Sequence, residues 1–319
     1  MKNFTSVHDV ENINALVQEA LMLKKAPYAF ADMGKHKTLG LIFMNPSLRT
    51  RLSTWKAAKN LGMDVAVMNI DKDGWALETE DGVMMNGDKV EHIREAAAVL
   101  GQYCDVIGLR SFPKLNDKHE DYSENILRKI INYSRVPVVS LESATRHPLQ
   151  SLADLVTITE MFQEWPKRKP KVVLTWAPHI KALPQAVPNS FAEWMGKAEV
   201  DLVITHPEGY ELAPEFTQGA TITHNQEEAL QDADFVYVKN WSSFHEYGNI
   251  LTKDKNWMLT NKKLYTTSNA RVMHCLPVRR DVELAAEVID GQNSIIIQQA
   301  GNRVFAAQAV LKNILEHNF

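Results

Sequence analysis

The sequence predicts an α/β protein built from two doubly wound parallel sheets. Segments of high β-propensity alternate with helical patterns along the whole chain, as is typical of parallel strands joined by crossover helices. The chain has 319 residues, about twice the usual 100–200 residues of one domain, so we expect two domains. Apolar residues make up 45% and charged residues 23% of the chain, an ordinary balance for a globular protein with a sizeable core.

The first half is expected to hold four strands and three helices. The strands are Lys37–Met44, Val65–Ile70, Cys104–Leu109 and Val136–Leu141. The helices between them are Leu48–Leu61, Val90–Leu100 and Tyr122–Tyr133. Asp88 and Glu91 are spaced as in a capping box, and Gly62 and Gly101 stand where helices tend to end.

The second half is expected to hold five strands after a helix, Pro148–Phe162, that joins the halves. The strands are Lys171–Thr175, Leu202–Thr205, Phe235–Val238, Arg271–Met273 and Ser294–Ile297. The stretch from Pro166 to Pro188 carries five of the chain's 13 prolines. Since proline is excluded from helix interiors, this stretch predicts a stiff loop around a short strand.

Charge and composition exclude several functional classes. The net charge of −4 provides no basic field for nucleic acid or an anionic membrane. No apolar run approaches the roughly 18 residues of a spanning helix, and the start of the chain lacks a signal-peptide pattern, so we expect a cytoplasmic protein. Cys104 and Cys275 form neither a disulfide framework nor a metal-ligand spacing and are expected to be buried thiols. A nicotinamide dehydrogenase shares the α/β pattern, but no Gly-x-Gly-x-x-Gly follows an early strand.

The end of the first expected strand has the composition of an anion site. Ser47 stands at the N-cap of the next helix, where free backbone amides face the carboxyl end of the sheet. The segment Asn45–Arg51 adds the guanidinium groups of Arg49 and Arg51 and the hydroxyls of Ser47 and Thr50, a donor set that suits phosphate. A capped surface helix with solvated arginines is the alternative interpretation.

Polar residues also follow the other expected strands, where open parallel sheets bind their ligands. In the first half these are Arg110, Glu142, Arg146, His147 and Gln150. In the second half they are Trp176, Lys239, His274 and Cys275. This distribution predicts a ligand cleft between the two domains.

Three of these segments resemble the motifs of the transcarbamylases, which transfer a carbamoyl group from carbamoyl phosphate to an amine. Ser47–Arg51 matches Ser-x-Arg-Thr-Arg, His147–Gln150 matches His-Pro-x-Gln, and His274–Pro277 matches His-Cys-Leu-Pro. The resemblance covers essentially the whole chain. It implies a carbamoyl-phosphate domain of residues 1–147, joined by a C-terminal helix (about 300–319, with Arg303–His317 at its centre), and an amine-substrate domain of residues 148–299.

The resemblance also implies roles for the motif residues. Ser47, Leu48, Arg49, Thr50 and Arg303 would bind the phosphate group. Arg110, His147 and Thr50 would contact the carbonyl oxygen that becomes an oxyanion, as the catalytic groups. Gln150 and the backbone carbonyls of Cys275 and Leu276 would accept hydrogen bonds from the carbamoyl nitrogen. No metal, organic cofactor or covalent intermediate is implied; Cys275 as a nucleophile is the disfavoured alternative, because the motif uses its backbone.

The amine substrate is indicated by a departure from the ornithine enzymes, which usually carry Asp-x-Trp-x-Ser-Met-Gly. Lys239 stands at the Asp position and would repel the α-ammonium of free ornithine, whereas an acylated nitrogen has no charge. The chain therefore resembles the N-acylornithine transcarbamylases of arginine biosynthesis, whose Trp-Ala-Pro-His and Asn-Ser segments stand at 176–179 and 189–190. The implied acylornithine contacts are Glu142, Trp176, Asn189, Lys239 and Arg279.

The same resemblance implies a homotrimer and a knotted C-terminal domain. Trp75 and Val90 would reach the substrate site of a neighbouring subunit, Trp75 on the carbamoyl-phosphate side and Val90 on the acylornithine side. Trp75 as a plug of its own subunit's core is the alternative. The knot would involve the loop 176–188 and the chain after Lys239.

Two positions favour N2-succinyl-L-ornithine as the substrate. The acetyl enzymes carry Glu, and the succinyl enzymes Pro, where this chain has Val90, and an apolar side chain there removes repulsion of the succinyl carboxylate. Glu283 stands where the acetyl enzymes carry Lys. The alternatives are N2-acetyl-L-ornithine and, less favoured, free ornithine. A non-catalytic protein with a degenerate site is disfavoured, because the phosphate and carbamoyl motif residues are all present.

Overall fold

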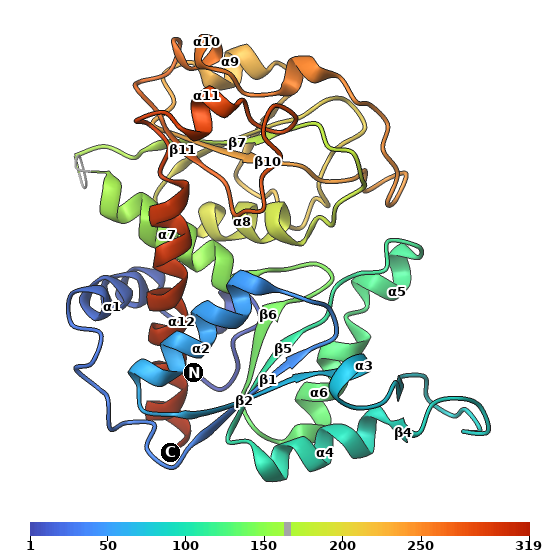
Figure 1. Ribbon diagram of the computed structural model, residues 1–319. Helices are drawn as coiled ribbons and strands as arrows, with labels where there is room; N and C mark the ends of the chain where they lie inside the picture. Colours follow the sequence, from blue (N-terminus) through green and yellow to red (C-terminus); the bar gives the residue numbers. More distant parts are fainter. Residues whose placement is uncertain (163–166) are drawn as a thin grey trace. The chain divides into compact units, whose positions relative to one another are not determined.

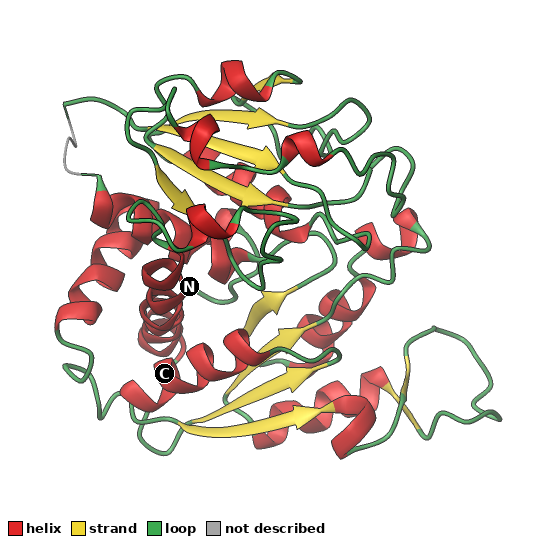
Figure 2. Cartoon of the chain, turned by 45° about the horizontal axis from the view of Figure 1, so that its top comes forward, coloured by secondary structure: helices red, strands yellow, loops and turns green. Residues whose placement is uncertain are grey.

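The computed structural model describes residues 1–162 and 167–319, and these form two compact units (Figure 1). Unit 1 comprises Met1–Leu149 and Arg303–Phe319, and unit 2 comprises Gln150–Asn302. Each unit contains a parallel sheet, four-stranded in unit 1 and five-stranded in unit 2, and Figure 2 shows the strands of each sheet lying among helices. The predicted α/β class with two parallel sheets is confirmed.

The sheet of unit 1 has the strand order β2-β1-β5-β6. Its strands are β1 (Thr38–Phe43), β2 (Asp64–Asn69), β5 (Val106–Arg110) and β6 (Val138–Glu142), so the four predicted strands are confirmed with small shifts of their ends. The inner strands β1 and β5 are nearly continuous buried apolar runs, as expected where helices cover both faces of a parallel sheet.

The remaining elements of unit 1 are helices and one short ribbon. The helices are η1 (Val7–Asp9), α1 (Ile13–Lys25), α2 (Leu48–Asn60), α3 (Ile70–Asp73), α4 (Ile93–Tyr103), α5 (Lys118–Tyr122) and α6 (Asn125–Ser134). The ribbon pairs β3 (Leu77–Glu78) with β4 (Glu91–His92).

Helix boundaries in unit 1 differ from the predicted ones in two places. α4 begins at Ile93 with His92 as its N-cap, whose Nδ1 accepts from the Arg94 N–H at 3.2 Å; the predicted start at Val90 and the Asp88 capping box are wrong. α6 begins at Asn125 because Glu124 has a left-handed φ of 52°, which separates it from α5.

The two glycines expected to end helices behave differently. Gly62 has a φ of 81° directly after the last turn of α2, which confirms its role, since this conformation favours glycine. Gly101 instead lies inside α4. A Cβ at this position would stand 1.9 Å from the Ser134 carbonyl oxygen, so this glycine allows α4 and α6 to approach each other.

The sheet of unit 2 has the strand order β11-β10-β7-β8-β9. Its strands are β7 (Lys171–Trp176), β8 (Asp201–Thr205), β9 (Thr221–Thr223), β10 (Phe235–Lys239) and β11 (Arg271–Met273). Four of the predicted strands are confirmed, and β9 was missed. The predicted strand Ser294–Ile297 is wrong: Ser294 makes only an isolated bridge to Val272, and a helix begins at Ile296.

The helices of unit 2 include the two that carry the chain between the units. These two are α7 (Pro148–Met161) and α12 (Ile296–Asn318), and the others are α8 (Ala186–Lys197), α9 (Gln226–Leu230), η2 (Lys255–Trp257), α10 (Asn261–Leu264) and α11 (Ala286–Ile289). The predicted joining helix is confirmed. The predicted stiff loop ends earlier than expected, because Pro188 lies in the first turn of α8, where a missing N–H costs no helical hydrogen bond; Pro166 lies outside the described residues.

The segments after β7 and β10 lie side by side in unit 2. The Asn240 amide donates to the Ala177 carbonyl at 2.6 Å, and the Ser242 N–H donates to the Leu183 carbonyl at 2.9 Å. These are the two segments that the resemblance implicates in a knot, and the crossing itself stays a prediction.

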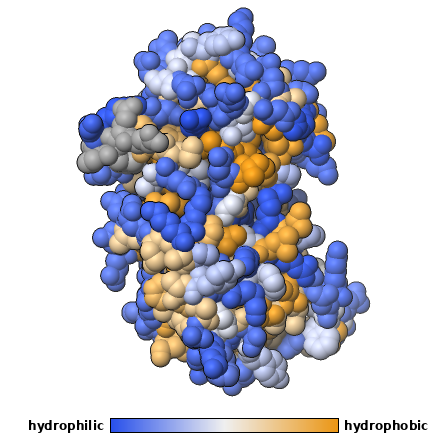
Figure 3. All heavy atoms as spheres, turned by 60° about the vertical axis from the view of Figure 1, so that its left-hand side comes forward, coloured by the Kyte–Doolittle hydropathy of each residue, from blue (hydrophilic) through white to orange (hydrophobic). Residues whose placement is uncertain are grey.

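None of the helices within residues 1–162 and 167–319 combines the length and the apolar character needed to cross a bilayer. Hydrophilic side chains are spread over the face drawn in Figure 3, with smaller hydrophobic areas between them.

Candidate functional site

The strand order places a switch point in each sheet. The chain winds outward in opposite directions from β1, between β1 and β5 in unit 1, and from β7, between β7 and β10 in unit 2. Open α/β sheets bind ligands beyond the carboxyl ends of the strands at such points. The segment 45–51 follows β1, and Arg110 ends β5. Trp176 and Lys239 end β7 and β10, so the predicted site residues gather at both switch points.

The N-terminus of α2 presents donors without an internal acceptor. Ser47 is the N-cap with extended backbone, but its side chain makes no capping hydrogen bond to the helix. The first amides of α2 therefore keep their donor capacity at the positive end of the helix dipole. Thr50, only 1% exposed, accepts a hydrogen bond from Arg303 of α12 at 2.6 Å. Unit 1 thus brings the predicted phosphate residues at 47–50 together with Arg303, which is 253 residues away from Thr50 in sequence.

A buried cluster of three ionisable side chains lies at the ends of β5 and β6. Arg110 and Glu142 are aligned in the register of the two strands and form an ion pair. His147 Nε2 lies 3.5 Å from Glu142 Oε2. Arg110, Glu142 and His147 are therefore one cluster, in which Glu142 compensates the charge of the guanidinium.

His147 is held neutral by its surroundings. Burial lowers the pKa of His147 well below its ordinary value, and the positive charges of Arg303 and Arg110 lower it further. A neutral imidazole carries one N–H and can donate it to a developing oxyanion without first losing a proton.

The turn before His147 is fixed by Glu124. One Glu124 carboxylate oxygen accepts hydrogen bonds from the Ser143 hydroxyl at 2.6 Å and from the N–H and hydroxyl of Thr145 at 2.8 and 2.6 Å. The Ser143 N–H in turn donates to the Arg146 carbonyl at 2.8 Å. This network sets the direction in which the chain enters α7, and so the position of His147.

In unit 2, Asp154 joins two of the predicted motifs. Its Oδ1 accepts from the amides of Gln150 and Gln299, each at 2.7 Å. Gln299 accepts from the backbone N–H of His274 at 2.8 Å. The His-Pro-x-Gln segment is therefore tied through Asp154 and Gln299 to the His-Cys-Leu-Pro segment.

The backbone after β11 turns sharply at Cys275 and Leu276, whose carbonyls the resemblance assigns to the carbamoyl nitrogen. Leu276 has a φ of 58° and precedes a cis peptide bond to Pro277, and its N–H donates to His274 Nδ1 at 2.8 Å. A positive φ is costly for a residue other than glycine, and it persists where the surrounding structure holds the backbone in place. Cys275 is 9% exposed and Cys104 is 8% exposed. Both thiols are buried, as predicted.

Lys239 lies near a buried carboxylate. Glu283 is 1% exposed, and burial opposes its ionisation. The His274 ring, whose Nε2 lies 3.7 Å from Glu283 Oε1, the Lys239 charge and the Arg279 N–H nevertheless hold the pKa of Glu283 below its ordinary value. Lys239 itself is 8% exposed and donates to the Asn240 carbonyl at 3.0 Å. Glu283 thus stabilises a positive charge at the end of β10.

Trp176 and Asn189, two of the predicted acylornithine contacts, are buried in this structure. Trp176 is 1% exposed, its indole N–H donates to the Trp241 carbonyl at 2.9 Å, and its ring packs 4.7 Å from that of Tyr210. Asn189 is fully buried. In this conformation both residues belong to the core beneath the strand ends, so Trp176 supports neighbouring groups.

Arg279 and its neighbour Arg280 have different environments. Arg280 forms a bidentate ion pair with Asp290 at 2.6 and 2.8 Å, so its charge is already matched by the protein. Arg279 is exposed and its Nε donates to His179 at 3.0 Å, which joins it to the Trp-Ala-Pro-His segment.

Trp75 and Val90 lie on an exposed loop of unit 1 between α3 and α4, which extends away from the sheet (Figure 1). They are 54% and 68% exposed, so Trp75 is no core plug, and its indole N–H donates to Glu91 at 2.9 Å.

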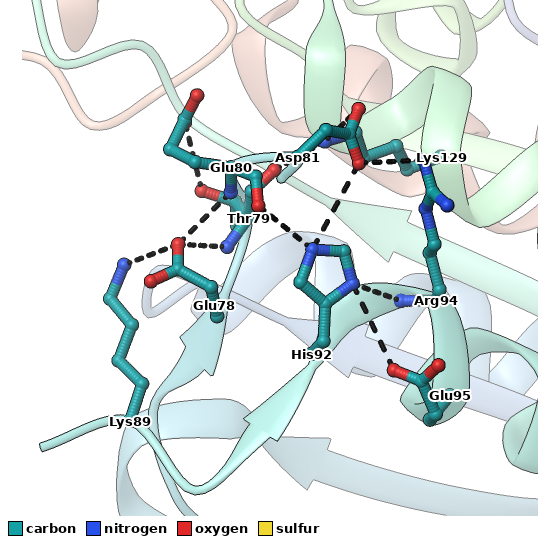
Figure 4. A network of polar contacts seen from close by, with 9 residues as sticks. All are labelled: Glu78, Thr79, Glu80, Asp81, Lys89, His92, Arg94, Glu95 and Lys129. Carbon is teal, nitrogen blue, oxygen red and sulfur yellow. Dashed lines mark hydrogen bonds and ion pairs between the residues drawn. The ribbon is translucent and has the colours of Figure 1, made fainter. Parts of the chain in front are cut away.

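The base of this loop is held by the polar network in Figure 4. Asp81 pairs with Arg94 at 2.9 Å and Lys129 at 3.1 Å, and His92 Nε2 lies 2.9 Å from the Glu80 carbonyl oxygen. Backbone N–H groups, chiefly that of Glu80, and Lys89 lower the pKa of Glu78 to about 2.

Sequence reasoning missed Glu124, Asp154, Gln299 and the role of Glu283. Asp154 stands four residues after Gln150, on the same face of a helix, and that spacing was an available signal. Glu124 and Gln299 carried no comparable signal, because their partners are 19 or more residues away.

Comparisons with known proteins cover both units. A family model described as aspartate/ornithine carbamoyltransferase, carbamoyl-P binding domain, matches residues 2–160, and the corresponding Asp/Orn binding domain matches residues 184–314. The chain is 51% identical over 318 residues to the N-succinylornithine carbamoyltransferase of Bacteroides thetaiotaomicron, with 99% of each chain covered. It is 34% identical over 331 residues to the N-acetylornithine carbamoyltransferase of Xylella fastidiosa (strain Temecula1), with 98% of each covered.

Solved structures give the same result for the fold. A mutant of N-acetyl-L-ornithine transcarbamylase complexed with PALAO matches with a TM-score of 0.93 and 33% identity, covering 98% of this chain and 100% of that chain. A glutamate-to-valine mutant of the same protein, complexed with carbamyl phosphate and N-succinyl-L-norvaline, matches with a TM-score of 0.92 and 33% identity over the same shares. Since the family models and these relatives span both units and their strand-end motifs, the chain belongs to the aspartate/ornithine carbamoyltransferase family.

Proposed function

We propose that this protein transfers the carbamoyl group of carbamoyl phosphate to the δ-amine of N2-succinyl-L-ornithine, forming N-succinylcitrulline and phosphate. The observation that carries the proposal is the donor set at the switch point of unit 1, where the α2 N-terminus, Thr50, Arg303, Arg110 and neutral His147 gather. This set matches the two charges that the reaction creates, a departing phosphate and an oxyanion.

In this mechanism, unit 1 binds carbamoyl phosphate. Ser47, Arg49 and the Leu48 amide, with Thr50 and Arg303, hold the phosphate, because guanidinium and backbone N–H groups donate to its oxygens. Arg110 and His147 donate to the carbonyl oxygen. Glu142 keeps Arg110 in place, and an acylornithine contact of Glu142 would use the part of its carboxylate that Arg110 leaves accessible.

The reaction then proceeds by addition of the amine to the carbonyl carbon, followed by elimination of phosphate. The amine nitrogen forms a bond to the carbonyl carbon, the bond from that carbon to the phosphate oxygen breaks, and the amine proton leaves with the phosphate. An alkylamine has an unperturbed pKa of about 10.4, so the substrate ammonium must first lose one proton to solvent before the amine attacks; the second proton is the one that leaves with the phosphate. Gln150 and the carbonyls of Cys275 and Leu276 orient the carbamoyl nitrogen for this attack.

Unit 2 supplies the groups that select an acylated ornithine. Lys239 and Arg279 attract the α-carboxylate, and a positive Lys239 repels an unmodified α-ammonium. Asn189 and Trp176 are buried, so we assign them the support of this surface. The division into a carbamoyl-phosphate domain and an acylornithine domain follows the two units.

Val90 favours the succinyl substrate over the acetyl one. A neutral side chain leaves room for the second carboxylate, which a glutamate would repel. A glutamate-to-valine mutant of N-acetyl-L-ornithine transcarbamylase, complexed with carbamyl phosphate and N-succinyl-L-norvaline, supports this reasoning.

A cytoplasmic homotrimer completes the proposal, with Trp75 and Val90 reaching the site of a neighbouring subunit. The loop that carries them also exposes the apolar side chains of Val83, Met84 and Met85, which are 44%, 81% and 42% exposed. Apolar side chains on a loop with an anchored base suit contact with another protein surface.

Product formation with three substrates in parallel tests the activity. Carbamoyl phosphate is supplied with N-succinylornithine, N-acetylornithine or ornithine, and kcat/KM is expected to be highest for N-succinylornithine. A higher value for ornithine would contradict the role of Lys239, and no turnover with any substrate would contradict the proposed activity. The Arg110→Gln variant is expected to lower kcat by about 10²- to 10³-fold, while the exposed Arg128→Gln on α6 serves as the matched control and keeps the wild-type kcat.

A further inference from the structure

Two histidines and a glutamate converge at the outer part of the unit 2 sheet, apart from the residues assigned to the reaction. His206 directly follows β8 and His224 directly follows β9. These strands pair in parallel with Thr205 opposite Thr223, so the two histidines are neighbours at the carboxyl edge of the sheet. One ligand atom from each of His206, Glu211 and His224 lies within 4.8 Å of the others.

The ring orientations of both histidines are set by backbone carbonyls. His206 Nδ1 lies 2.8 Å from the Pro207 carbonyl oxygen, and His224 Nδ1 lies 3.0 Å from the His206 carbonyl oxygen. Because a carbonyl can only accept, each Nδ1 carries a proton, and in the neutral form of each ring the lone pair is on Nε2. Histidine ligands of metals show this arrangement, in which the second ring nitrogen donates to a carbonyl or carboxylate.

We propose that His206, Glu211 and His224 bind a divalent transition-metal ion, with Zn²⁺ as the best-matched ion. Two imidazoles and one carboxylate are a common ligand set for Zn²⁺, which takes water as a fourth ligand. Hard cations such as Mg²⁺ select oxygen ligands and fit this set poorly.

A bound ion would fix the loop that supports the aromatic core beneath Lys239. Tyr210 lies in this loop between two of the ligands. Its ring packs on Trp176, its carbonyl accepts from the Trp241 indole at 2.7 Å, and its hydroxyl accepts from the Leu251 N–H at 2.7 Å. The metal would therefore join the strand ends of β8 and β9 to this loop and stabilise unit 2.

Metal binding by the purified full-length protein tests the proposal without any substrate, so it stands apart from the test of carbamoyl transfer. Tag-free protein stripped with a chelator is titrated with ZnCl₂ while Tm is followed, and Co²⁺ is added separately to detect the visible absorption of an ion bound by nitrogen ligands. We expect Zn²⁺ to raise Tm, because a ligand that binds only the native state stabilises it. MgCl₂ is expected to leave Tm unchanged.

Variants at the accessible ligands locate the site. Glu211→Gln and His224→Asn each remove one ligand, and neither side chain is buried. Each variant is expected to raise the Kd for Zn²⁺ at least tenfold. His245→Asn, at an exposed histidine of the same unit, is the matched control and should bind like the wild type. An unchanged Kd in both ligand variants, no Zn²⁺ effect on the wild type, or binding that is lost only in Cys275→Ser would each overturn the proposal.

Discussion

At the scale of single residues, the site depends on which charges are compensated inside the protein. Arg110 is paired with Glu142, and Arg280 with Asp290, whereas Lys239 gains the nearby negative charge of Glu283. His147 lies among positive charges without gaining one itself. Buried charges persist only when they are paired or hydrogen-bonded. Because His147 lies near the guanidinium groups of Arg110 and Arg303, its imidazole stays neutral and remains a hydrogen-bond donor.

The neutral state of His147 predicts a pH dependence of stability. Below a pH of about 6.5 the unfolded chain gains a proton at this histidine that the native state does not bind, so native stability falls as the pH falls. The contribution is about 1.4 kcal/mol per pH unit until the native pKa is reached. Denaturant unfolding of the wild type and of His147→Gln between pH 7 and pH 5 checks this. The variant should show the shallower decline, and parallel curves would contradict a lowered His147 pKa.

A second residue-scale prediction concerns substrate choice. Val90→Glu places a negative charge where we expect the succinyl carboxylate, and like charges in contact repel each other. We expect this repulsion to lower the ratio of kcat/KM for succinylornithine to that for acetylornithine at least tenfold. The measurement is that ratio for the wild type, Val90→Glu and the neutral Val90→Gln. An unchanged ratio in Val90→Glu, or an equal fall in Val90→Gln, would show that charge at this position does not set specificity.

At the scale of elements, a close contact between two helix backbones explains a glycine that helix propensity alone did not explain. α4 and α6 pack against each other, and the contact at Gly101 leaves no room for a side chain. Glycine is a poor helix former, which made Gly101 resemble a helix end in the sequence. Its position is explained by packing, because only a residue without Cβ admits the Ser134 carbonyl there.

This contact predicts that Gly101→Ala destabilises the protein although alanine favours helices. The added Cβ would stand 1.9 Å from a backbone oxygen, so the helices must shift, at a cost of about 1–3 kcal/mol. Gly301→Ala is the matched control, since nothing lies within 4 Å of its Cβ position in α12, and it should be neutral or stabilising by up to about 1 kcal/mol. Urea unfolding compares the two; equal effects would contradict the packing argument.

At the scale of the whole molecule, unit 1 is assembled from both ends of the chain. The Phe4 N–H donates to the Val138 carbonyl at 2.9 Å beside β6, and α12 returns with Arg303 against α2. Gln308 of α12 is fully buried; it accepts from Asn60 at 2.9 Å and donates to the Pro27 carbonyl at 2.7 Å. The last helix is therefore part of the fold that presents the phosphate residues.

Removing the Gln308 amide should lower the stability of unit 1. Gln308→Ala leaves the buried Asn60 donor and the partly buried Pro27 carbonyl without this partner, and a buried unsatisfied group costs about 1–3 kcal/mol. Gln298→Ala, on an exposed position of the same helix, is the matched control and should change stability by less than about 0.5 kcal/mol. Thermal unfolding measures both, and a Tm of Gln308→Ala equal to that of the control would contradict this role for α12.

Local sequence patterns were enough to predict the fold class, the eight strands named above and the motifs at their ends. These features are local, because a buried strand needs only a short apolar run and a strand-end motif lies within a few residues. Family membership follows from the same segments.

The features that the sequence did not predict have partners that are distant in sequence. The strand expected at Ser294–Ile297 became the start of α12, Trp176 became part of a buried aromatic cluster, and Glu124 became the anchor of the turn before His147. The triad His206, Glu211 and His224 has no recognisable spacing, because β8 and β9 bring its histidines together across the sheet. In each case the energy depends on a backbone or side-chain partner that only the folded chain brings within contact distance, so no local pattern could specify it.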